Sequence, residues 1–418
     1  MRRVVVTGIG TINSTGHNVK DSFEAVVNGV CGIDAITLFD ASEFSVKIAG
    51  EVKDFDPTTV MDKKEVKKAD RFIQLGIKAA LEAMIDSGYV TQEDKKVDAS
   101  IADRFGMISG SGIGGLSTIE RNSIVCETKG SRKVSPFFIP SSLANMLSGF
   151  ISIEHNLRGP SLSHVTACAA STHALNDAVK TIMIGGADRI LVVGAESAIC
   201  AAGVAGFAAM KALSTRNDNP KKSSRPFDVD RDGFVMGEGA GALVVEDLEI
   251  ALARGAKIYA EIIGFGESGD ANHITSPVMD GPLRAMKAAL EMVKSITGEY
   301  PKIDYINAHG TSTPVGDKNE TAAIKALFEG KDIPLVSSTK GQIGHCLGAA
   351  GAIEAIFTLK ALEEGIIPPT INIDNQDPEC DLDYIANVAR KANLTTVMSN
   401  NFGFGGTNGS VIFRRYEK

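Results

Sequence analysis

One cysteine lies in a sequence context that suits nucleophilic chemistry. Cys168 falls in LSHVTACAASTHALNDAVKTIM, where a strand-like run changes through small residues into a helical pattern. A thiol at the N-terminus of a helix faces unpaired N–H groups and the positive end of the helix dipole. We therefore expect a lowered pKa for Cys168 and backbone donors that can stabilise an oxyanion. The alternative, a small buried apolar residue as most cysteines are, fits the position equally well.

Two histidines share a second kind of context. His309, in DYINAHGTSTPVGD, and His345, in SSTKGQIGHCLGAAGA, each lie beyond a predicted strand at a glycine-containing turn. Open α/β sheets place their functional residues at such strand ends, so we expect both histidines near Cys168. The other histidines lack this arrangement and are interpreted as structural or exposed: His17, His155, His164, His173 and His273.

A thiol and two imidazoles are compatible with three kinds of chemistry. As metal ligands these residues lie far apart in the sequence and include no HExxH pair, which is a weak zinc signal. A hydrolase elbow needs glycine at the two positions that hold Thr166 and Ala170. Thioester acyl transfer fits better, because a thiolate can attack a carbonyl while neutral imidazole N–H groups stabilise an enolate or oxyanion.

Two glycine-rich segments follow predicted strands. SGSGIGGLST contains the spacing GxGxxG at Gly110, Gly112 and Gly115, but no acidic residue ends a second strand about 20 residues later, as a dinucleotide site requires. We interpret these glycines as close backbone packing beside a narrow pocket. In FGFGGTNG, Phe404 stands between glycines and is either a mobile gate or a core side chain at a tight turn.

Composition limits the class of protein. A chain of 418 residues with 44% hydrophobic content is not disordered, and no apolar run reaches the roughly 18 residues of a membrane-spanning helix. The net charge of −8 argues against binding to nucleic acid or anionic lipid. Six cysteines without a CxxC pair, and an N-terminus without a signal-peptide pattern, indicate a cytoplasmic protein with free thiols.

One segment of this acidic chain is rich in lysine. MDKKEVKKADR, residues 61–71, would place Lys63, Lys67 and Arg71 on one helical face, with Lys64 and Lys68 beside them. The segment is a candidate docking surface for an acidic partner. Its interspersed acidic residues are equally typical of a solvated helix face.

The elements that would position these residues alternate between strands and helices. β-branched runs such as RILVVGA and PLVSSTK alternate with segments such as GPLRAMKAALEMVKS, whose apolar residues recur every three or four positions. This alternation predicts an α/β fold with at least partly parallel sheets.

An internal repeat refines the prediction of fold. The order of strand, small-residue turn and helix around Cys168 recurs in LVSSTKGQIGHCLGAAGAIEAIFTLKAL, and GFVMGEGAGALVVED resembles GFGFGGTNGSVIFRR. We predict two similar halves, residues 1–255 and 256–418, with a large permanent interface. The extra length of the first half is assigned to an insertion around 115–165.

Taken together, the segments VTACAAST, NAHGTSTPVGD, SSTKGQIGHCLGAAGA and SNNFGFGGTNGS resemble the β-ketoacyl-ACP synthases of the thiolase superfamily, and the likeness runs from end to end. The stretch IIPPTINIDNQDPECDLDYIAN and Ile113 resemble the synthase II branch of that family, which elongates longer acyl chains, more than the synthase I branch. The resemblance implies a thiolase-like fold with two duplicated α/β halves in five αβαβα layers. It also implies a homodimer, an acyl carrier protein (ACP) as partner, acyl and malonyl thioesters as substrates, and no cofactor.

The resemblance also implies roles for individual residues. Cys168 would carry the acyl group, His309 and His345 would support malonyl decarboxylation, and Lys340 would organise the site electrostatically. Phe404 would be the gate, its N–H forming the oxyanion hole with that of Cys168. Four further groups are implied. The phosphopantetheine arm would bind Thr311 and Thr313, and the acyl pocket would be lined by Ile113 and Phe207. The carrier would dock on Lys63, Lys64, Lys67, Lys68 and Lys211. A monovalent cation would lie near Asn307, Glu354, Ser399 and Asn400, and no metal is required.

Related functions remain as alternatives. A degradative thiolase would need a second catalytic cysteine near the C-terminus, whereas Cys380 stands in a loop-like stretch without Cys-x-Gly. A type III synthase would have asparagine in place of His345, and a chain-length factor would lack the nucleophile. A ketosynthase subunit of polyketide synthesis remains possible, and we expect it to need a partner chain.

Overall fold

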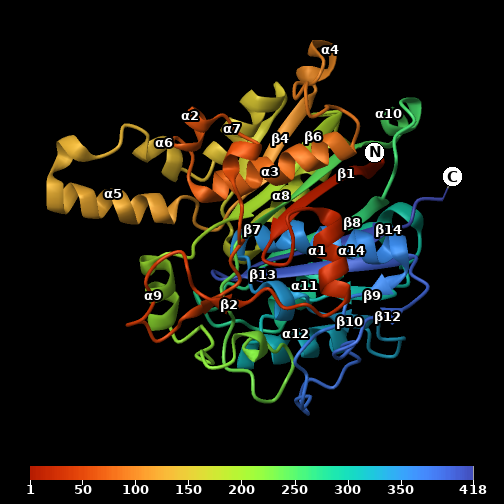
Figure 1. Ribbon diagram of the computed structural model, residues 1–418. Coiled ribbons are helices and arrows are strands. Elements are labelled where there is room, and N and C mark those ends of the chain that lie inside the picture. The colour runs from red at the N-terminus through yellow and green to blue at the C-terminus, as the bar shows by residue number, and fades with distance from the viewer. Residues whose placement is uncertain (418) are drawn as a thin grey trace.

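The protein is represented by a computed structural model that describes residues 1–417. Its centre is a ten-stranded sheet made of two five-stranded portions, which meet where Val4–Val6 pair with Ala260–Ile262 (Figure 1). In sheet order, the first portion consists of β5 (Ser161–His164), β4 (Phe105–Gly110), β6 (Arg189–Glu196), β7 (Gly239–Asp247) and β1 (Val4–Asn13). The second consists of β8 (Ala260–Gly269), β14 (Thr407–Arg414), β13 (Thr396–Gly403), β9 (Tyr305–Asn307) and β10 (Leu335–Ser337).

The two portions have the same pattern of strand directions. β5, β4 and β6 are parallel, and β7 and β1 follow antiparallel. In the same way β10, β9 and β13 are parallel, and β14 and β8 follow antiparallel. The chain therefore forms the same sheet twice, arranged symmetrically about the contact between β1 and β8. The predicted duplication of an α/β unit is confirmed by this topology.

Helices cover both portions and fill the space between them. α3 (Arg71–Asp86) and α7 (Met146–His155) pack on the first portion, while α11 (Asp280–Thr297), with α12 (Pro314–Leu327) beside it, packs on the second. α8 (Ala170–Met183) and α14 (Ala350–Glu364) contact each other and both portions (Figure 1). The order of layers is αβαβα, as the sequence predicted.

The burial pattern of each helix matches its layer. α11 is amphipathic and buries Ala285, Ala289 and Val293 on one face, as a surface helix does. α14 is buried on nearly all sides, which suits a central helix. Small residues allow close approach there: a Cβ at Gly241 of β7 would lie 2.7 Å from the backbone of Ala352.

Both central helices begin with the same turn. The short 3-10 helices η3 (Ala167–Ala169) and η5 (Leu347–Ala349) immediately precede α8 and α14. Each starts with a residue in the left-handed region, Ala167 at φ 50° and Leu347 at φ 47°. Cys168 therefore corresponds to Gly348 in the other half, and His345 lies just before that second turn.

The extra length of the first half falls in three places. Segments 14–104, 111–160 and 197–238 are longer than the counterparts 270–304, 308–334 and 404–406. Only the second of them falls where a single insertion was expected, around 115–165, so that expectation accounts for part of the extra length; this segment forms α5 (Leu116–Lys129), which projects from the body, and α6 (Phe138–Ser142) (Figure 1). The predicted boundary at 255/256 lies in the connection between α10 (Leu248–Ala253) and β8.

The remaining elements are short. They are α1 (Val19–Val27), α2 (Lys63–Val66), α4 (Ala99–Ala102), α9 (Ala201–Ala209), α13 (Lys340–Ile343), the 3-10 helices η1 (Pro57–Thr59), η2 (Ser131–Lys133) and η4 (Pro220–Lys222), and the two-residue strands β2 (Asp34–Ala35), β3 (Ile48–Ala49), β11 (Ile366–Ile367) and β12 (Arg390–Lys391). Within residues 1–417, no helix combines the length and the apolar character needed to cross a bilayer.

Candidate active site

One cavity collects most of the residues that the sequence singled out. Its volume is about 350 Å³, and Cys168, His309 and His345 all line it. It lies beyond the C-terminal ends of parallel strands, because His309 follows β9 and Cys168 follows β5. Four other predicted residues line the same cavity: Lys211, Thr311, Thr313 and Phe404.

Two opposing effects act on the pKa of the Cys168 thiol. The side chain is only 7% exposed, and burial raises the pKa of its thiol to about 12. The charge of Lys340 and the backbone N–H groups of Phe404 and Cys168 act in the opposite direction. The expectation of a lowered pKa is therefore wrong, because loss of solvent outweighs the helix N-terminus. The two N–H groups nevertheless act at the sulfur, beside the position that the oxygen of a substrate carbonyl would take during attack.

The two histidines face each other beside the thiol. Their ring centroids are 5.4 Å apart with an interplanar angle of 85°. Burial, followed by the charge of Lys340, places the pKa of both imidazoles well below 6.5, so both are neutral near neutral pH. The Nδ1 atom of each is buried without a hydrogen-bond partner in the described chain. Each ring can thus act as a neutral hydrogen-bonding group.

A carboxylate that the sequence analysis missed holds the loop of His309. Glu320, on α12, accepts the N–H groups of His309 (2.9 Å) and Gly310 (2.8 Å). Burial raises the pKa of Glu320 to about 7 in spite of these two donors. Its position in NETAAIKALFE looks like an ordinary helix position, and only the fold shows that it faces the histidine loop.

Lys340 is buried behind the histidines in a paired network. Its Nζ forms an ion pair with Glu354, and both side chains are at most 1% exposed. The other oxygen of Glu354 accepts the side-chain N–H of Asn401 (2.7 Å), whose oxygen accepts the hydroxyl of Thr172 (2.6 Å). A buried charge is tolerated only when it is paired, so this network holds the positively charged ammonium group of Lys340 close to the cavity.

The four residues predicted near a cation belong to neighbouring elements. Asn307 pairs in register with Ser399 of β13, and its side-chain N–H reaches the carbonyl oxygen of Glu354 (3.5 Å). Asn307 Oδ1 and Ser399 Oγ are buried without a partner in the described chain. Asn400 is occupied differently, because its oxygen accepts the hydroxyl of Ser410 (2.8 Å). Unpaired buried oxygens of this kind fit a hard cation.

The residues predicted to bind substrate divide into two groups. Thr311 and Thr313 lie together in the cavity, with their hydroxyl oxygens 3.0 Å apart. Phe207, on α9, packs against Phe404 with ring centroids 6.5 Å apart, but it is not part of the cavity lining. Ile113 is also outside the lining, in the loop before α5.

The glycines of the loop that carries Ile113 pack closely, as predicted. A Cβ at Gly110 would lie 2.5 Å from the backbone nitrogen of Ser171, and one at Gly115 would lie 2.4 Å from the carbonyl oxygen of Ser141. These contacts account for the GxGxxG spacing without a nucleotide.

The lysine-rich segment is not one continuous helix. α2 ends at Val66, and the Asp70 side chain caps α3 by accepting the N–H of Phe72 (3.2 Å). Arg71 turns inward and pairs with Glu238 (2.8 Å). The predicted single helical face over 61–71 is therefore wrong, because a polar side chain inside the segment begins a new helix.

The lysines themselves remain at the surface. Lys63, Lys64 and Lys67 are exposed and form no ion pair within residues 1–417. Lys68 pairs with Glu65 (2.6 Å). Lys211 is exposed at the cavity.

A segment that sequence reasoning overlooked covers the cavity. Asp270 and residues 273–278 line it, including His273, which is exposed as expected. The carbonyl of Ile274 accepts the N–H of Gly405 (2.7 Å), and the N–H of Asp270 donates to Gly406 (2.9 Å). The turn of Phe404 thus rests against this segment.

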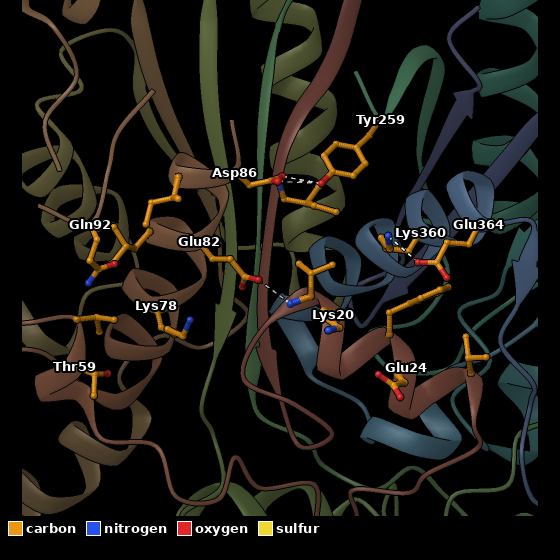
Figure 2. Close-up of a pocket in the computed structure, with 17 residues that line it drawn as sticks. Lys20, Glu24, Thr59, Lys78, Glu82, Asp86, Gln92, Tyr259, Lys360 and Glu364 are labelled. Carbon is orange, nitrogen blue, oxygen red and sulfur yellow. Dashed lines mark hydrogen bonds and ion pairs between the residues drawn. The ribbon is translucent and has the colours of Figure 1, made fainter. Parts of the chain in front are cut away.

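A larger cavity of about 940 Å³ lies between α1, α3 and α14, away from the thiol (Figure 2). Asp86 accepts the N–H of Ile9 (2.9 Å) and the hydroxyl of Tyr259 (2.9 Å), and Glu82 accepts the N–H of Thr11 (3.0 Å). These carboxylates cap an edge of β1 that β8 leaves unpaired, which protects the sheet from further pairing. No cysteine or histidine lines this cavity, so acyl transfer is assigned to the smaller one.

Comparison with known proteins agrees with this geometry. A chain named 3-oxoacyl-[acyl-carrier-protein] synthase 2 from Vibrio harveyi is 49% identical over 99% of both chains. A crystal structure of a β-ketoacyl synthase from Burkholderia phymatum superposes with a TM-score of 0.91 at 36% identity, covering both chains fully. A polyketide ketosynthase in complex with its acyl carrier protein gives a TM-score of 0.86 at 30% identity, also over both full chains.

Family comparison covers most of the chain. Residues 1–251 match the N-terminal domain of β-ketoacyl synthases, and residues 259–374 match the C-terminal domain. The protein belongs to the β-ketoacyl synthase family.

Proposed function

We propose that this protein is a 3-oxoacyl-ACP synthase, an acyltransferase that condenses acyl-ACP with malonyl-ACP in fatty acid chain elongation. One observation carries the proposal: a thiol, two neutral imidazoles and two converging N–H groups meet at one cavity. The full-length identity of 49% to a synthase of that name supports it.

The first step transfers the acyl group to Cys168. The sulfur attacks the thioester carbonyl, and the oxyanion is stabilised by the N–H groups of Cys168 and Phe404. When the carbon–sulfur bond to the carrier breaks, the thiol proton of Cys168 leaves with the carrier as its new thiol. Because burial raises the pKa of the resting thiol, we expect loss of its proton to accompany attack on the carbonyl.

The second step forms the carbon–carbon bond. His309 and His345 hydrogen-bond to the thioester oxygen of malonyl-ACP, CO2 leaves, and the electron pair of the broken bond forms an enolate. The enolate carbon attacks the acyl-enzyme carbonyl, and the Cys168 thiolate departs and takes up a proton. The products are 3-oxoacyl-ACP, CO2 and the free thiol. Loss of CO2 drives the reaction, so no redox cofactor or ATP is required.

Buried charges support this second step. Burial, with the charge of Lys340 as the second cause, keeps the pKa of both imidazoles low, and the ammonium group of Lys340, held by Glu354, adds positive potential behind the forming enolate. The unpaired oxygens of Asn307 and Ser399 would hold a monovalent cation, with Asn400 next to Ser399 in β13 and Glu354 nearby on α14. Such an ion would fix the loop ends and leave the reacting atoms untouched.

Different residues of the site would bind different parts of the substrate. Thr311 and Thr313 offer hydroxyl groups to the amides of the phosphopantetheine arm. Phe404 is a gate, because its turn lies between the thiol and Phe207, and its movement would open a path toward Phe207 and Ile113 for the acyl chain.

The acidic carrier protein would dock where the protein is locally basic. Lys63, Lys64 and Lys67 have no ion partners in the described chain, Lys68 is paired with Glu65, and Lys211 is a further exposed cation at the cavity. In a chain of net charge −8, such a concentration of cations favours an acidic partner. We expect the pair of changes Lys63→Glu and Lys67→Glu to raise KM for ACP substrates with little effect on kcat. Salt should weaken the difference, and an unchanged KM at low salt would reject this surface.

The enzyme would act as a homodimer. β5 pairs only with β4, and its Leu162 is 47% exposed at this sheet edge. Ile139 of α6 and Ile153 of α7 are 58% and 77% exposed. An open edge beside exposed apolar residues fits antiparallel pairing with β5 of a second copy. Leu162→Asp should shift the sedimentation coefficient toward that of a monomer.

A cytoplasmic location is part of the proposal. All six cysteines are free thiols, which is typical of a reducing compartment.

An assay of CO2 release tests the proposed reaction. Wild-type protein with acyl-ACP and malonyl-ACP should yield CO2 and 3-oxoacyl-ACP in equal amounts. His309→Ala and His345→Ala should each lower malonyl decarboxylation by at least about 100-fold, the effect of losing an oxyanion donor. Because both imidazole pKa values lie well below 6.5, the wild-type rate should not fall through histidine protonation between about pH 8 and 6.5. Unchanged CO2 release in both variants would reject these roles.

A polyketide ketosynthase subunit is the second candidate, because ketosynthases of that class share the fold over the full chain. Such a subunit would release CO2 only together with a partner chain. Activity of the purified protein alone would therefore separate the two functions.

A further inference from the structure

The two N–H groups at the thiol come from segments that are far apart in the sequence. Cys168 belongs to η3, whereas Phe404 belongs to the turn between β13 and β14. An oxyanion is stabilised only when both donors point at the same position. Some contact must therefore fix the turn of Phe404 relative to the turn of Cys168.

Hydrogen bonds through one histidine join these segments. His173, in the first turn of α8, has its Nδ1 2.7 Å from the hydroxyl of Thr166, two residues before the thiol. Its Nε2 lies 3.1 Å from the carbonyl oxygen of Asn408, just beyond the turn of Phe404. A second bond runs directly between the segments, because the Thr407 hydroxyl donates to the carbonyl oxygen of Thr166 (2.9 Å).

The geometry fixes the tautomer of His173. A carbonyl oxygen only accepts, so Nε2 carries the hydrogen that is donated to Asn408. In the neutral ring Nδ1 then accepts the hydroxyl of Thr166. Burial lowers the pKa of this imidazole, which favours the neutral form with one donor and one acceptor.

Glycines bring the two segments into direct contact at both ends of the turn. A Cβ at Gly403 would lie 2.9 Å from the carbonyl oxygen of Thr166 and 3.1 Å from the nitrogen of Cys168. A Cβ at Gly409 would lie 3.2 Å from Cδ2 of His173. The backbone beside Cys168 therefore has no room to accommodate a shift of the hairpin.

We propose that His173 is a positioning residue that holds the N–H of Phe404 in register with the N–H of Cys168. It does not line the cavity, and it acts through Thr166 and Asn408. The inference rests on the proposed function, because only acyl transfer needs an oxyanion site.

Comparison of two reactions of the same thiol tests this role. Acylation by an acyl-ACP passes through an oxyanion, whereas alkylation by iodoacetamide does not. His173→Phe keeps a ring but loses both bonds, and it should slow single-turnover acylation by at least about tenfold while alkylation stays within about twofold. His173→Gln can still donate at the position of Nε2 and should recover most of the acylation rate. Thr407→Val, which removes only the second bond, should show the same selective loss at smaller size.

His17→Gln is the matched control, because His17 is another partly buried histidine with its Nε2 near a backbone carbonyl oxygen, that of Lys53 (2.7 Å). It should leave both rates unchanged. Equal loss of acylation and alkylation in His173→Phe, or no loss of acylation, would overturn the inference. A wild-type protein that is alkylated but never acylated would instead overturn the proposed function, and the inference with it.

Discussion

The turns before the two central helices have similar backbone conformations but different roles. Ala167 and Leu347 both adopt the left-handed region, and each is followed by a 3-10 turn and a buried helix. In the first turn the N–H of Cys168 acts on its own thiol, which lines an open cavity. In the second, the N–H of Gly348 donates to the buried carboxylate of Glu196 (3.0 Å).

The difference shows how one scaffold provides both a site and its support. A helix N-terminus attracts negative charge, so each copy of the turn is an anion-binding element. In the proposed reaction the first turn binds a transient oxyanion, whereas the carboxylate of Glu196 already occupies the second turn. That carboxylate also accepts the N–H groups of Gly112 (2.5 Å) and Ile113 (3.2 Å), so the second turn anchors the loop of the predicted acyl pocket.

The largest expected loss of stability comes from Gly348→Ala. A Cβ there would lie 2.1 Å from the backbone nitrogen of Gly112, so the anchored loop must move. We expect the free energy of unfolding to fall by about 3 kcal/mol, the upper range for overpacking. Urea denaturation measures it, and Gly206→Ala is the control, because its Cβ would meet nothing within 4 Å and should raise helix stability. Equal stability of the two variants would show that the second turn is not a closed contact.

A smaller loss is expected from Glu196→Gln. The amide would present an N–H where the carboxylate accepts one, at a cost of about 2 kcal/mol. The change also removes a negative charge that raises the pKa of Cys168, so alkylation by iodoacetamide at fixed pH should become faster. Glu24→Gln, at an exposed position of α1, should alter neither quantity. Slower alkylation in Glu196→Gln would contradict the assigned effect of the charge.

The smallest effect concerns the strained backbone of the first turn. Ala167→Gly relieves a left-handed alanine, worth about 1 kcal/mol, but adds entropy to the unfolded chain, so the net change in stability should stay within about 0.5 kcal/mol. Ala169→Gly, at φ −93°, has no strain to relieve and should destabilise by about 0.5–1 kcal/mol. Thermal unfolding of the pair measures the contrast, and equal losses would mean that Ala167 is not strained.

The sequence analysis was most successful where local pattern determines structure. Alternating periodicities predicted an α/β fold, and the recurrence of strand, turn and helix predicted its duplication. The strand-end positions of His309 and His345 were enough to place them beside Cys168 in one cavity.

The sequence analysis failed where burial in the folded chain determines the pKa or the contacts of a residue. The pKa of Cys168 is raised because the folded chain removes solvent, which a sequence does not show. The lysine segment breaks because Asp70 caps α3 and also accepts the N–H of Thr118 (3.0 Å) from α5, a distant partner. Glu320 went unnoticed, and His173 was interpreted only as structural or exposed, because their partners lie across loops that only the fold brings together.

Acylation of Cys168, in the first turn, is the most direct test of the difference between the two turns. Intact-protein mass spectrometry after incubation with acyl-ACPs of several chain lengths should show one acyl group on the wild-type protein, with peptide mapping placing it on Cys168. Cys168→Ala should show none, although Cys31, Cys126, Cys200, Cys346 and Cys380 remain as free thiols. An acyl group on another cysteine, or an unmodified wild-type protein, would contradict the assignment of the first turn to catalysis.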